Sequence, residues 1–293
     1  MKPIFVFKKS SCMKKIRLAS RGSPLAMAQA KMAVDFLSAR IDAEFEIVEI
    51  KTKGDKNLGL SLSADGGSGL FTKEIELALL NNEADLAVHS AKDLPTAIPE
   101  NLRLAGCLPR DAYRDVLAIR ADVSVPSLIA SSSPRRRSQL KKIFPNAVWS
   151  ELRGNVHTRL SKIASGYADA TVLSEAGLVR LGISEFENIV FKPVKTEICV
   201  PAVGQGIIAL ECRAEDYELF GKLGDETSMH ALELERAFLI ALGGGCQSAC
   251  AGLYVDDTFS FFHENTGYQK VDMHGKTFEE KLQIVRELAS GVA

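Results

Sequence analysis

Short apolar runs alternate with segments of helical periodicity over the first two hundred residues. A helical pattern ends near Arg40, and another begins near Thr72. This alternation is typical of βαβ units and predicts a mainly parallel sheet. A second series of the same kind begins near Asp115 and ends near Val200. We therefore expect two α/β lobes. The apolar runs of the first series are IRLAS (16–20), EFEIVEIKT (44–52) and ADLAVHS (84–90).

The last third of the chain has a different pattern. A strong helical segment from about Thr227 to Leu242 is followed by the strand-like run ACAGLYV and by a Phe-rich stretch at 259–262. A closing helix is expected from about Thr277. These features indicate a small α+β domain of roughly 65 to 70 residues. Regular structure is expected from about Ile16, and we leave residues 1–13 out of the fold.

Composition excludes several classes of protein. The 293 residues carry a net charge of −1, so clusters of arginine stand against a neutral background. No apolar run approaches the ~18 residues that span a membrane, and no secretory signal is recognisable. The cysteines form no C-x-x-C pair, which argues against a disulfide framework or a structural zinc site. We expect a cytoplasmic protein with no membrane association and no metal site. The cysteines are Cys12, Cys107, Cys199, Cys212, Cys246 and Cys250.

Two Ser-Pro turns resemble each other. In LASRGSPLAMAQA and in IASSSPRRRSQL a strand leads through Ser-Pro into a helix. Ser23 and Ser133 are expected as N-caps, with Pro24 and Pro134 in the first helical position. Helix starts at the carboxyl ends of strands offer N–H groups to anions. The turns are either two anion sites or two ordinary caps.

Arginines recur at strand ends and in first helical turns. Guanidinium groups bind carboxylates or phosphates through paired hydrogen bonds, so the repetition indicates a ligand with several such groups. For the run PRRRSQLKK alone, a solvated helix face is the alternative. No aromatic residues interleave with the arginines, and no phosphate-binding glycine loop is present, so neither nucleic acid nor a nucleotide is expected. The arginines are Arg21, Arg135, Arg136, Arg137, Arg153, Arg159 and Arg180.

The segment LAVHSAKDLPT carries His89, Ser90, Lys92 and Asp93 where an apolar strand ends. Polar groups at such a place suit proton transfer, and a carboxylate there can stabilise a cationic intermediate. The alternative interpretation of Asp93 is that it is only a turn residue. The alternative for Lys92 is that it forms a Schiff base with the substrate.

The segment LGGGCQSAC ends the strong helix with three glycines before Cys246. Without side chains on the approach, a bulky group can come close to the sulfur. Cys246 is therefore a nucleophile, a tether or a buried thiol. Cys250 lies in the apolar run that follows and is expected in the core.

Taken together, these motifs resemble the porphobilinogen deaminase family of tetrapyrrole biosynthesis. The resemblance extends from about Ile16 through nearly the whole chain. The matching motifs, in order, are RGSPLA, KTKGD, GLFTKE, AVHSAKDLP, SSSPRRR, LRGNVHTRL, AGLVRLG, PAVGQG, ECR and GGGCQ.

The resemblance implies a fold of three domains. The first two resemble type II periplasmic binding proteins with the active cleft between them, and the third is the small α+β domain. Domain 1 would comprise 14–109 with 201–222, domain 2 would comprise 110–200, and the C-terminal domain would comprise 223–293. A monomer is implied as well.

The resemblance also implies the chemistry. Cys246 would hold a dipyrromethane cofactor through a thioether, and Asp93 would be the catalytic acid and base. Four porphobilinogen molecules would be deaminated and joined head to tail, and water would release hydroxymethylbilane. The remaining matched residues would bind the carboxylates of cofactor and substrate. They are Arg21, Ser23, Ser90, Lys92, Ser131, Ser133, Arg135, Arg136, Arg153, Arg159 and Arg180.

Two positions depart from the family pattern. Ser68 stands where the family commonly has lysine, and Cys250 adds a thiol close to Cys246. Two other readings of the chain remain: a solute-binding module without catalysis, and a transferase in which Cys246 forms an acyl intermediate.

Overall fold

Two units make up the part of the chain that the computed structural model describes, which is residues 15–52, 72–221, 223–243 and 249–292. The first unit contains the described residues within Met1–Asn57, Ser68–Pro109 and Ile207–Met229. The second contains those within Arg110–Gly206 and His230–Ala293.

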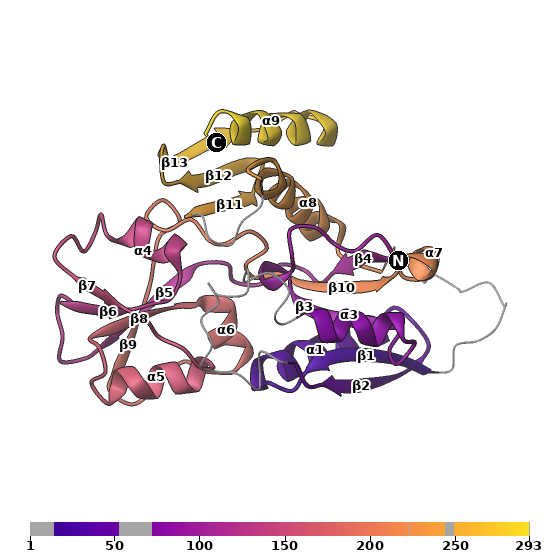
Figure 1. Ribbon diagram of the computed structural model, residues 1–293, viewed down its shortest axis with the longest axis horizontal. Helices are drawn as coiled ribbons and strands as arrows, with labels where there is room; N and C mark the ends of the chain where they lie inside the picture. Colours follow the sequence, from indigo (N-terminus) through magenta and orange to yellow (C-terminus); the bar gives the residue numbers. More distant parts are fainter. Residues whose placement is uncertain (1–14, 53–71, 222, 244–248, 293) are drawn as a thin grey trace. The chain divides into compact units, whose positions relative to one another are not determined.

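The first unit is built on a five-stranded sheet that receives one strand from late in the sequence. The strand order is β2-β1-β3-β10-β4, and β10 runs antiparallel to both of its neighbours. Figure 1 shows β10, coloured orange, beside the purple β3 and β4. Its elements are β1 (Lys15–Arg21), α1 (Pro24–Ser38), β2 (Glu44–Ile50), α3 (Lys73–Leu80), β3 (Leu86–Ser90), the 3-10 helix η1 (Ala91–Asp93), β4 (Leu102–Cys107), β10 (Ile208–Arg213), the 3-10 helix η2 (Ala214–Asp216) and α7 (Tyr217–Phe220).

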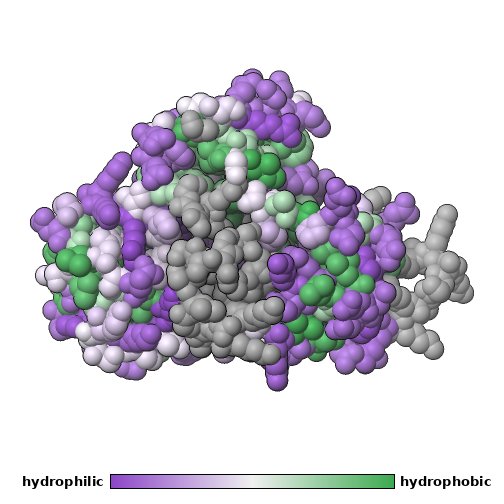
Figure 2. Space-filling view, viewed as in Figure 1, coloured by the Kyte–Doolittle hydropathy of each residue, from purple (hydrophilic) through white to green (hydrophobic). Residues whose placement is uncertain are grey.

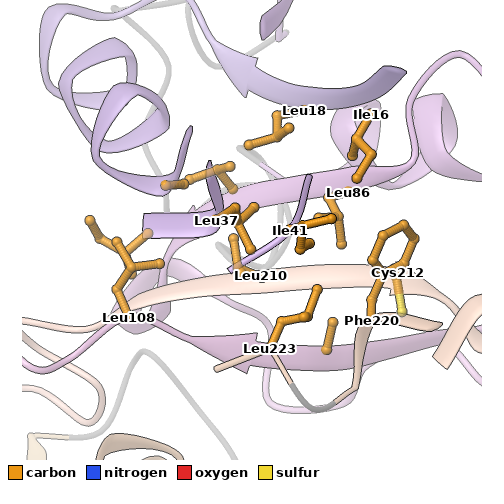
Figure 3. Packing of buried hydrophobic residues seen from close by; sticks show 14 residues of the cluster. Ile16, Leu18, Leu37, Ile41, Leu86, Leu108, Leu210, Cys212, Phe220 and Leu223 are labelled. Carbon is orange, nitrogen blue, oxygen red and sulfur yellow. The ribbon is translucent and has the colours of Figure 1, made fainter. Parts of the chain in front are cut away.

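Both faces of this sheet are covered, because alternate residues of its strands are apolar on each side. On one face, Leu18 of β1 and Leu210 of β10 pack with Leu37 of α1, and Figure 3 shows these side chains pointing toward one another. On the other face, Ala19 and Ala87 pack against residues of α3. Sheets buried on both sides need continuous apolar strands, which is the pattern of LAVHS.

The second unit contains a sheet of the same design. The strand order is β7-β6-β8-β5-β9, and β5 is antiparallel to β8 and β9. In each sheet one strand therefore runs against the other four. The elements are β5 (Asp115–Arg120), β6 (Leu128–Ala130), α4 (Pro134–Leu140), β7 (Val148–Ser150), α5 (Val156–Ala164), β8 (Ala170–Ser174), α6 (Glu175–Arg180) and β9 (Ile189–Pro193).

The C-terminal segment forms a three-stranded antiparallel sheet with two helices. Phe259 and Phe261 of β12 point to one face, where they pack with Phe238 of α8 and with residues of α9. Phe262 points to the opposite face and packs with Val200. In the view of Figure 2 the outer surface of α9 is mainly hydrophilic. The elements are α8 (Glu226–Ala241), β11 (Cys250–Val255), β12 (Thr258–His263), β13 (Gly267–Asp272) and α9 (Phe278–Ser290).

A buried ion pair ties this segment to the rest of the second unit. Arg110 binds both carboxylate oxygens of Glu235 on α8, at 2.6 and 2.9 Å, and the Glu235 side chain is fully buried. The same carboxylate accepts hydrogen bonds from the backbone N–H groups of Gly204 and Tyr254, at 2.7 and 2.8 Å. One glutamate thus joins three segments that are far apart in the sequence.

The fold prediction is confirmed in its main points. Two α/β sheets of mainly parallel strands and a C-terminal α+β segment are present, and both Ser-Pro turns cap helices as expected. The helix predicted from PRRRSQLKKIF is shorter than its pattern and ends at Leu140. In the described part of the chain, no helix has the length and apolar character that crossing a membrane requires. The boundaries of the three domains stay a prediction.

We expect Glu235→Gln to lower the free energy of unfolding by about 3–5 kcal/mol, because it leaves the Arg110 guanidinium buried without its counter-charge. Urea denaturation measures this difference. Arg114→Ala, which removes a more exposed ion pair with Glu175, is the matched control and should change stability little. Equal effects of the two substitutions would contradict the role of the buried pair.

Candidate active site

The carboxyl end of β3 carries Ser90, Lys92 and Asp93. The strand ends at Ser90, and η1 turns the chain so that Lys92 is half-buried and Asp93 is exposed. The turn is held to the neighbouring strand segment, since the backbone N–H of Ala91 donates to the carbonyl of Ile207 at 3.0 Å. Among the described residues no ion pair involves Asp93, so its carboxylate is available for proton transfer.

The end of β1 lies at the same edge of the sheet. Strands β1 and β3 are parallel neighbours with Leu18 opposite Leu86, so Arg21 and Ser90 close adjacent strands. Ser23 caps α1 by accepting a hydrogen bond from the Ala26 N–H at 3.3 Å. The cap uses the hydroxyl oxygen as acceptor, which leaves the O–H proton to donate to a ligand.

A side-chain contact links these two turns. Gln29, on the buried face of α1, bonds to the hydroxyl of Ser90 through its amide nitrogen at 2.8 Å. Nothing in the sequence identifies Gln29, because the pattern of a helix does not show that one of its glutamines faces the end of a strand. The structure therefore brings Arg21, Ser23, Ser90, Lys92 and Asp93 to one edge of the first sheet.

The corresponding edge of the second sheet carries Ser131 and Ser133. Ser131 follows β6 and donates its backbone N–H to the carbonyl of Ser150 at 2.9 Å. Its hydroxyl accepts from the N–H of Ser133 at 3.3 Å, and the Ser133 hydroxyl accepts from the N–H of Arg136 at 3.4 Å. Ser132 bonds to both backbone groups of Leu152 at 3.1 Å, which joins this turn to the loop that carries Arg153.

Arg135 and Arg136 are buried against a carboxylate that the sequence analysis missed. Nη1 of Arg135 lies 2.7 Å from Oδ2 of Asp115, and Nη2 of Arg136 lies 2.7 Å from Oδ1 of the same residue. Arg136 also bonds to the carbonyl of Val172 at 2.8 Å. The two residues are only 7 and 8% exposed, so a solvated helix face is not their environment. Asp115 gave no signal because its partners lie twenty residues further along the chain.

Burial by itself raises the pKa of Asp115, but the charges and hydrogen bonds of Arg135 and Arg136 outweigh it and hold the pKa well below its usual range. The carboxylate is therefore ionised near neutral pH, and the three groups together carry one positive charge. The thiol of Cys199 contacts this cluster at 3.4 Å from Asp115, and burial raises its pKa to about 12. Cys199 is thus a neutral neighbour.

The remaining arginines lie on the loops and helices that follow β7 and β8. Arg153 is half-buried in the loop after β7, and Nε of Arg159 on α5 donates to the carbonyl of Gly154 at 2.8 Å. Arg180, the last residue of α6, has a side chain only 4% exposed. It donates from Nη2 to the carbonyl of Gly206 at 2.7 Å and lies 3.4 Å from Asp111.

An ion pair with Asp111 holds the buried Nε atom of Arg180. The atoms Nε and Oδ2 are 3.4 Å apart, in a geometry that gives an ion pair without a hydrogen bond. Burial lowers the pKa of Arg180, and the Asp111 carboxylate opposes this shift. The guanidinium of Arg180 is therefore already paired within its own unit.

Two predicted positions, Cys246 and Ser68, lie outside the described residues. Cys250 is half-buried and is the first residue of β11, where it pairs with His263 of β12. It lies in a strand, as its alternation predicts, but the expectation that it is in the core is wrong, because at the start of β11 it is only half-buried.

A sequence model of one protein family matches most of this chain. The model is described as the dipyromethane cofactor binding domain of porphobilinogen deaminase, and it covers residues 16–220. The chain belongs to the porphobilinogen deaminase family. The matched range contains both strand-end clusters and Asp93, and it ends before Cys246.

Curated members of the porphobilinogen deaminase family are similar over most of their length. The porphobilinogen deaminase of Bacillus subtilis (strain 168) is 44% identical over 253 residues, covering 83% of this chain and 80% of the relative. That of Geobacillus sp. (strain WCH70) is 42% identical over 256 residues, covering 84% and 81%. A probable porphobilinogen deaminase of Methanocaldococcus jannaschii is 44% identical over 250 residues, covering 83% of each.

Solved structures of binding domains show a more distant likeness of fold. The periplasmic VFT2 domain of Bordetella pertussis BvgS has a TM-score of 0.42 and 16% identity, covering 71% of this chain and 85% of that one. An ancestral cationic amino acid solute binding protein has a TM-score of 0.44 and 12% identity, covering 75% and 90%.

We expect Asp115→Asn to lower the free energy of unfolding by about 3–5 kcal/mol at pH 7, because two buried guanidinium groups lose their counter-charge. The folded-state pKa of Asp115 is depressed, so its stabilisation is fully present above the unfolded-state pKa of about 4 and is lost as pH falls through the lower folded-state value. Urea denaturation at several pH values should therefore give a difference from wild type that shrinks below about pH 4.

The matched control for this measurement is Asp122→Asn, which neutralises the exposed partner of Arg120. It should not measurably change the urea midpoint. If Asp115→Asn is equally silent, the two buried arginines do not depend on this carboxylate.

Proposed function

We propose that this chain is a porphobilinogen deaminase, which joins four porphobilinogen molecules head to tail and releases ammonia and hydroxymethylbilane. The observation that carries the proposal is the family match over residues 16–220, which contains every expected carboxylate-binding residue and Asp93. The high identity to curated porphobilinogen deaminases supports it. We also propose that the protein works in the cytoplasm as a monomer, which size-exclusion chromatography with light scattering tests.

Each strand edge offers donor groups that suit the carboxylate side chains of a dipyrromethane. Ser23 and Ser133 keep an O–H proton after capping their helices, and we propose that Arg180 contributes its positive charge. When bound, the cofactor supplies the pyrrole carbon to which the first substrate is joined. We propose that Cys246 holds it through a thioether.

We propose that Arg135 and Arg136 act on the ligand in different ways. Among the described residues Arg135 donates only through Nη1, so its other nitrogens remain for a carboxylate. Arg136 uses all three nitrogens on Asp115 and on the carbonyl of Val172. Its contribution to binding is therefore the net positive charge of the cluster, which attracts carboxylates over several ångströms.

We propose that Asp93 transfers the protons of the reaction. An exposed carboxyl group at the end of a buried strand can, when protonated, give its proton to the departing amine. The resulting carboxylate can later accept the proton that the attacking pyrrole α-carbon loses once the new carbon–carbon bond has formed. While ionised, it also stabilises the cation that forms when ammonia leaves. We propose that Lys92, on the same turn, binds a carboxylate of the ligand. The same role is proposed for Arg21, Ser90, Ser131, Arg153 and Arg159.

Intact mass spectrometry of the purified protein tests the tether. We expect wild type to carry a covalent addition equal to two pyrrole units, and Cys246→Ala to lack it. Cys250→Ala is the matched control and should keep the addition. A wild-type chain of unmodified mass would contradict the proposal, and an acyl adduct would favour a cysteine-nucleophile transferase.

Asp93→Asn should keep the cofactor, because the amide has the size of the carboxylate and does not take part in attachment. We expect turnover of porphobilinogen to fall about 10²- to 10⁴-fold, which is the usual contribution of a general acid or base. Steady-state assays of ammonia release measure it. Turnover close to that of wild type would remove Asp93 from this role.

A further inference from the structure

Three ionisable side chains that the proposed reaction does not use are buried together in the first unit. His89 lies on β3, Glu211 on β10 and Glu76 on α3, with exposures of 5, 0 and 8%. His89 is on the same face of β3 as Ala87, and that face packs against α3. The position of His89 between apolar residues in LAVHS gave no sign of its partners.

Two of the three side chains are in contact, and polar atoms of the group lack partners. Nε2 of His89 lies 3.1 Å from Oε2 of Glu211, and the two side chains are 3 and 1% exposed. Glu76 is close enough to both for their charges to affect its pKa. The second oxygen of Glu211 and Oε1 of Glu76 are buried and have no hydrogen-bond partner among the described residues. The described residues contain no group of His, Cys, Asp and Glu that could hold a metal ion.

A count of charges limits the protonation states. One imidazolium can balance only one of the two carboxylates, and an unbalanced charge at this depth is costly. Burial raises the pKa of Glu76, and the charge of Glu211 adds to the shift, whereas Thr72, His89 and Lys73 oppose it. The thiol of Cys212, the residue that follows Glu211, adds no charge to the group at neutral pH, since burial raises its pKa to about 11.

The contact between His89 and Glu211 lies on the strand that leads into the turn with Asp93. His89 is paired with Ala209 across β3 and β10, and Glu211 is two residues further along β10, so their side chains meet diagonally across the two strands. Asp93 follows His89 by four residues. The His89–Glu211 contact therefore fixes β3 against β10 immediately before the strand ends and η1 begins.

We propose that His89 and Glu211 position Asp93, and that Glu76 carries a proton so that it places no second negative charge beside Glu211. The contact between His89 and Glu211 holds the end of β3 in register with β10. The positioning role rests on the proposed function, whereas the protonation of Glu76 does not.

Stability measurements test the protonation states. Glutamine has the shape of a protonated glutamate, so Glu76→Gln should fold at least as well as wild type. In wild type the folded state keeps a proton that the unfolded state loses above about pH 4.3, so its stability declines as pH rises from there toward the folded-state pKa of Glu76. The urea midpoint of Glu76→Gln should therefore exceed that of wild type by an amount that grows as pH rises above about 5.

Two variants calibrate this comparison. Glu83→Gln makes the same chemical change at an exposed site of the same unit and should show no such trend. Glu211→Gln should lower the urea midpoint at pH 7, because it removes the buried carboxylate that Nε2 of His89 contacts at 3.1 Å. If Glu76→Gln is destabilised as strongly as Glu211→Gln, Glu76 is ionised and the assignment is wrong.

Activity measurements test the positioning role. We expect Glu211→Gln and His89→Gln to keep the covalent pyrrole mass and to change KM by less than about threefold, while kcat falls by about tenfold or more, since small misplacement of a catalytic group is costly. Folding is verified by circular dichroism. Wild-type kcat in both folded variants would overturn the role. A wild-type protein that consumes no porphobilinogen would overturn the proposed function and leave the stability test valid.

Discussion

The carboxylate of Asp115 is the constraint on which the second unit depends. It is fully buried at the start of β5, and it stays ionised only because Arg135 and Arg136 surround it. Gln205 adds a hydrogen bond at 3.1 Å. The first turn of α4 and the segment around Gln205 are thus fixed to β5. Two of the candidate ligand-binding arginines are in this way positioned by a residue that itself has no access to the ligand.

The protein balances its buried carboxylates in three different ways. Asp115 has two guanidinium groups, which leaves a positive charge beside the candidate site. Glu235 is paired with one guanidinium and accepts hydrogen bonds from two backbone N–H groups, so its charge is neutralised. Its role is to join segments of the chain. Glu211 has only the imidazole of His89, at 3.1 Å.

The sequence predicted the parts of this structure that depend on local pattern. Strand and helix periodicity, the caps at Ser23 and Ser133, and the position of Asp93 at a strand end all follow from neighbouring residues. It did not predict the partners of the buried charges, because Asp115 and Glu211 meet residues 20 and 122 positions away. It also did not predict that Arg135 and Arg136 are buried. A run of arginines is typical of a solvent-exposed helix face, and nothing in the run indicates its pairing with Asp115.

The place of β10 in the first sheet has a consequence for how the protein is made. Residues 208–213 lie between β3 and β4, so these two strands have no hydrogen-bonded neighbour in common until β10 arrives. The strands of the second sheet, by contrast, are all complete at Pro193. During synthesis, residues 115–193 can therefore close the second sheet before β10 is made, while strands of the first sheet still have exposed edges. Synthesis proceeds from the N-terminus, but the first sheet is completed only after the second.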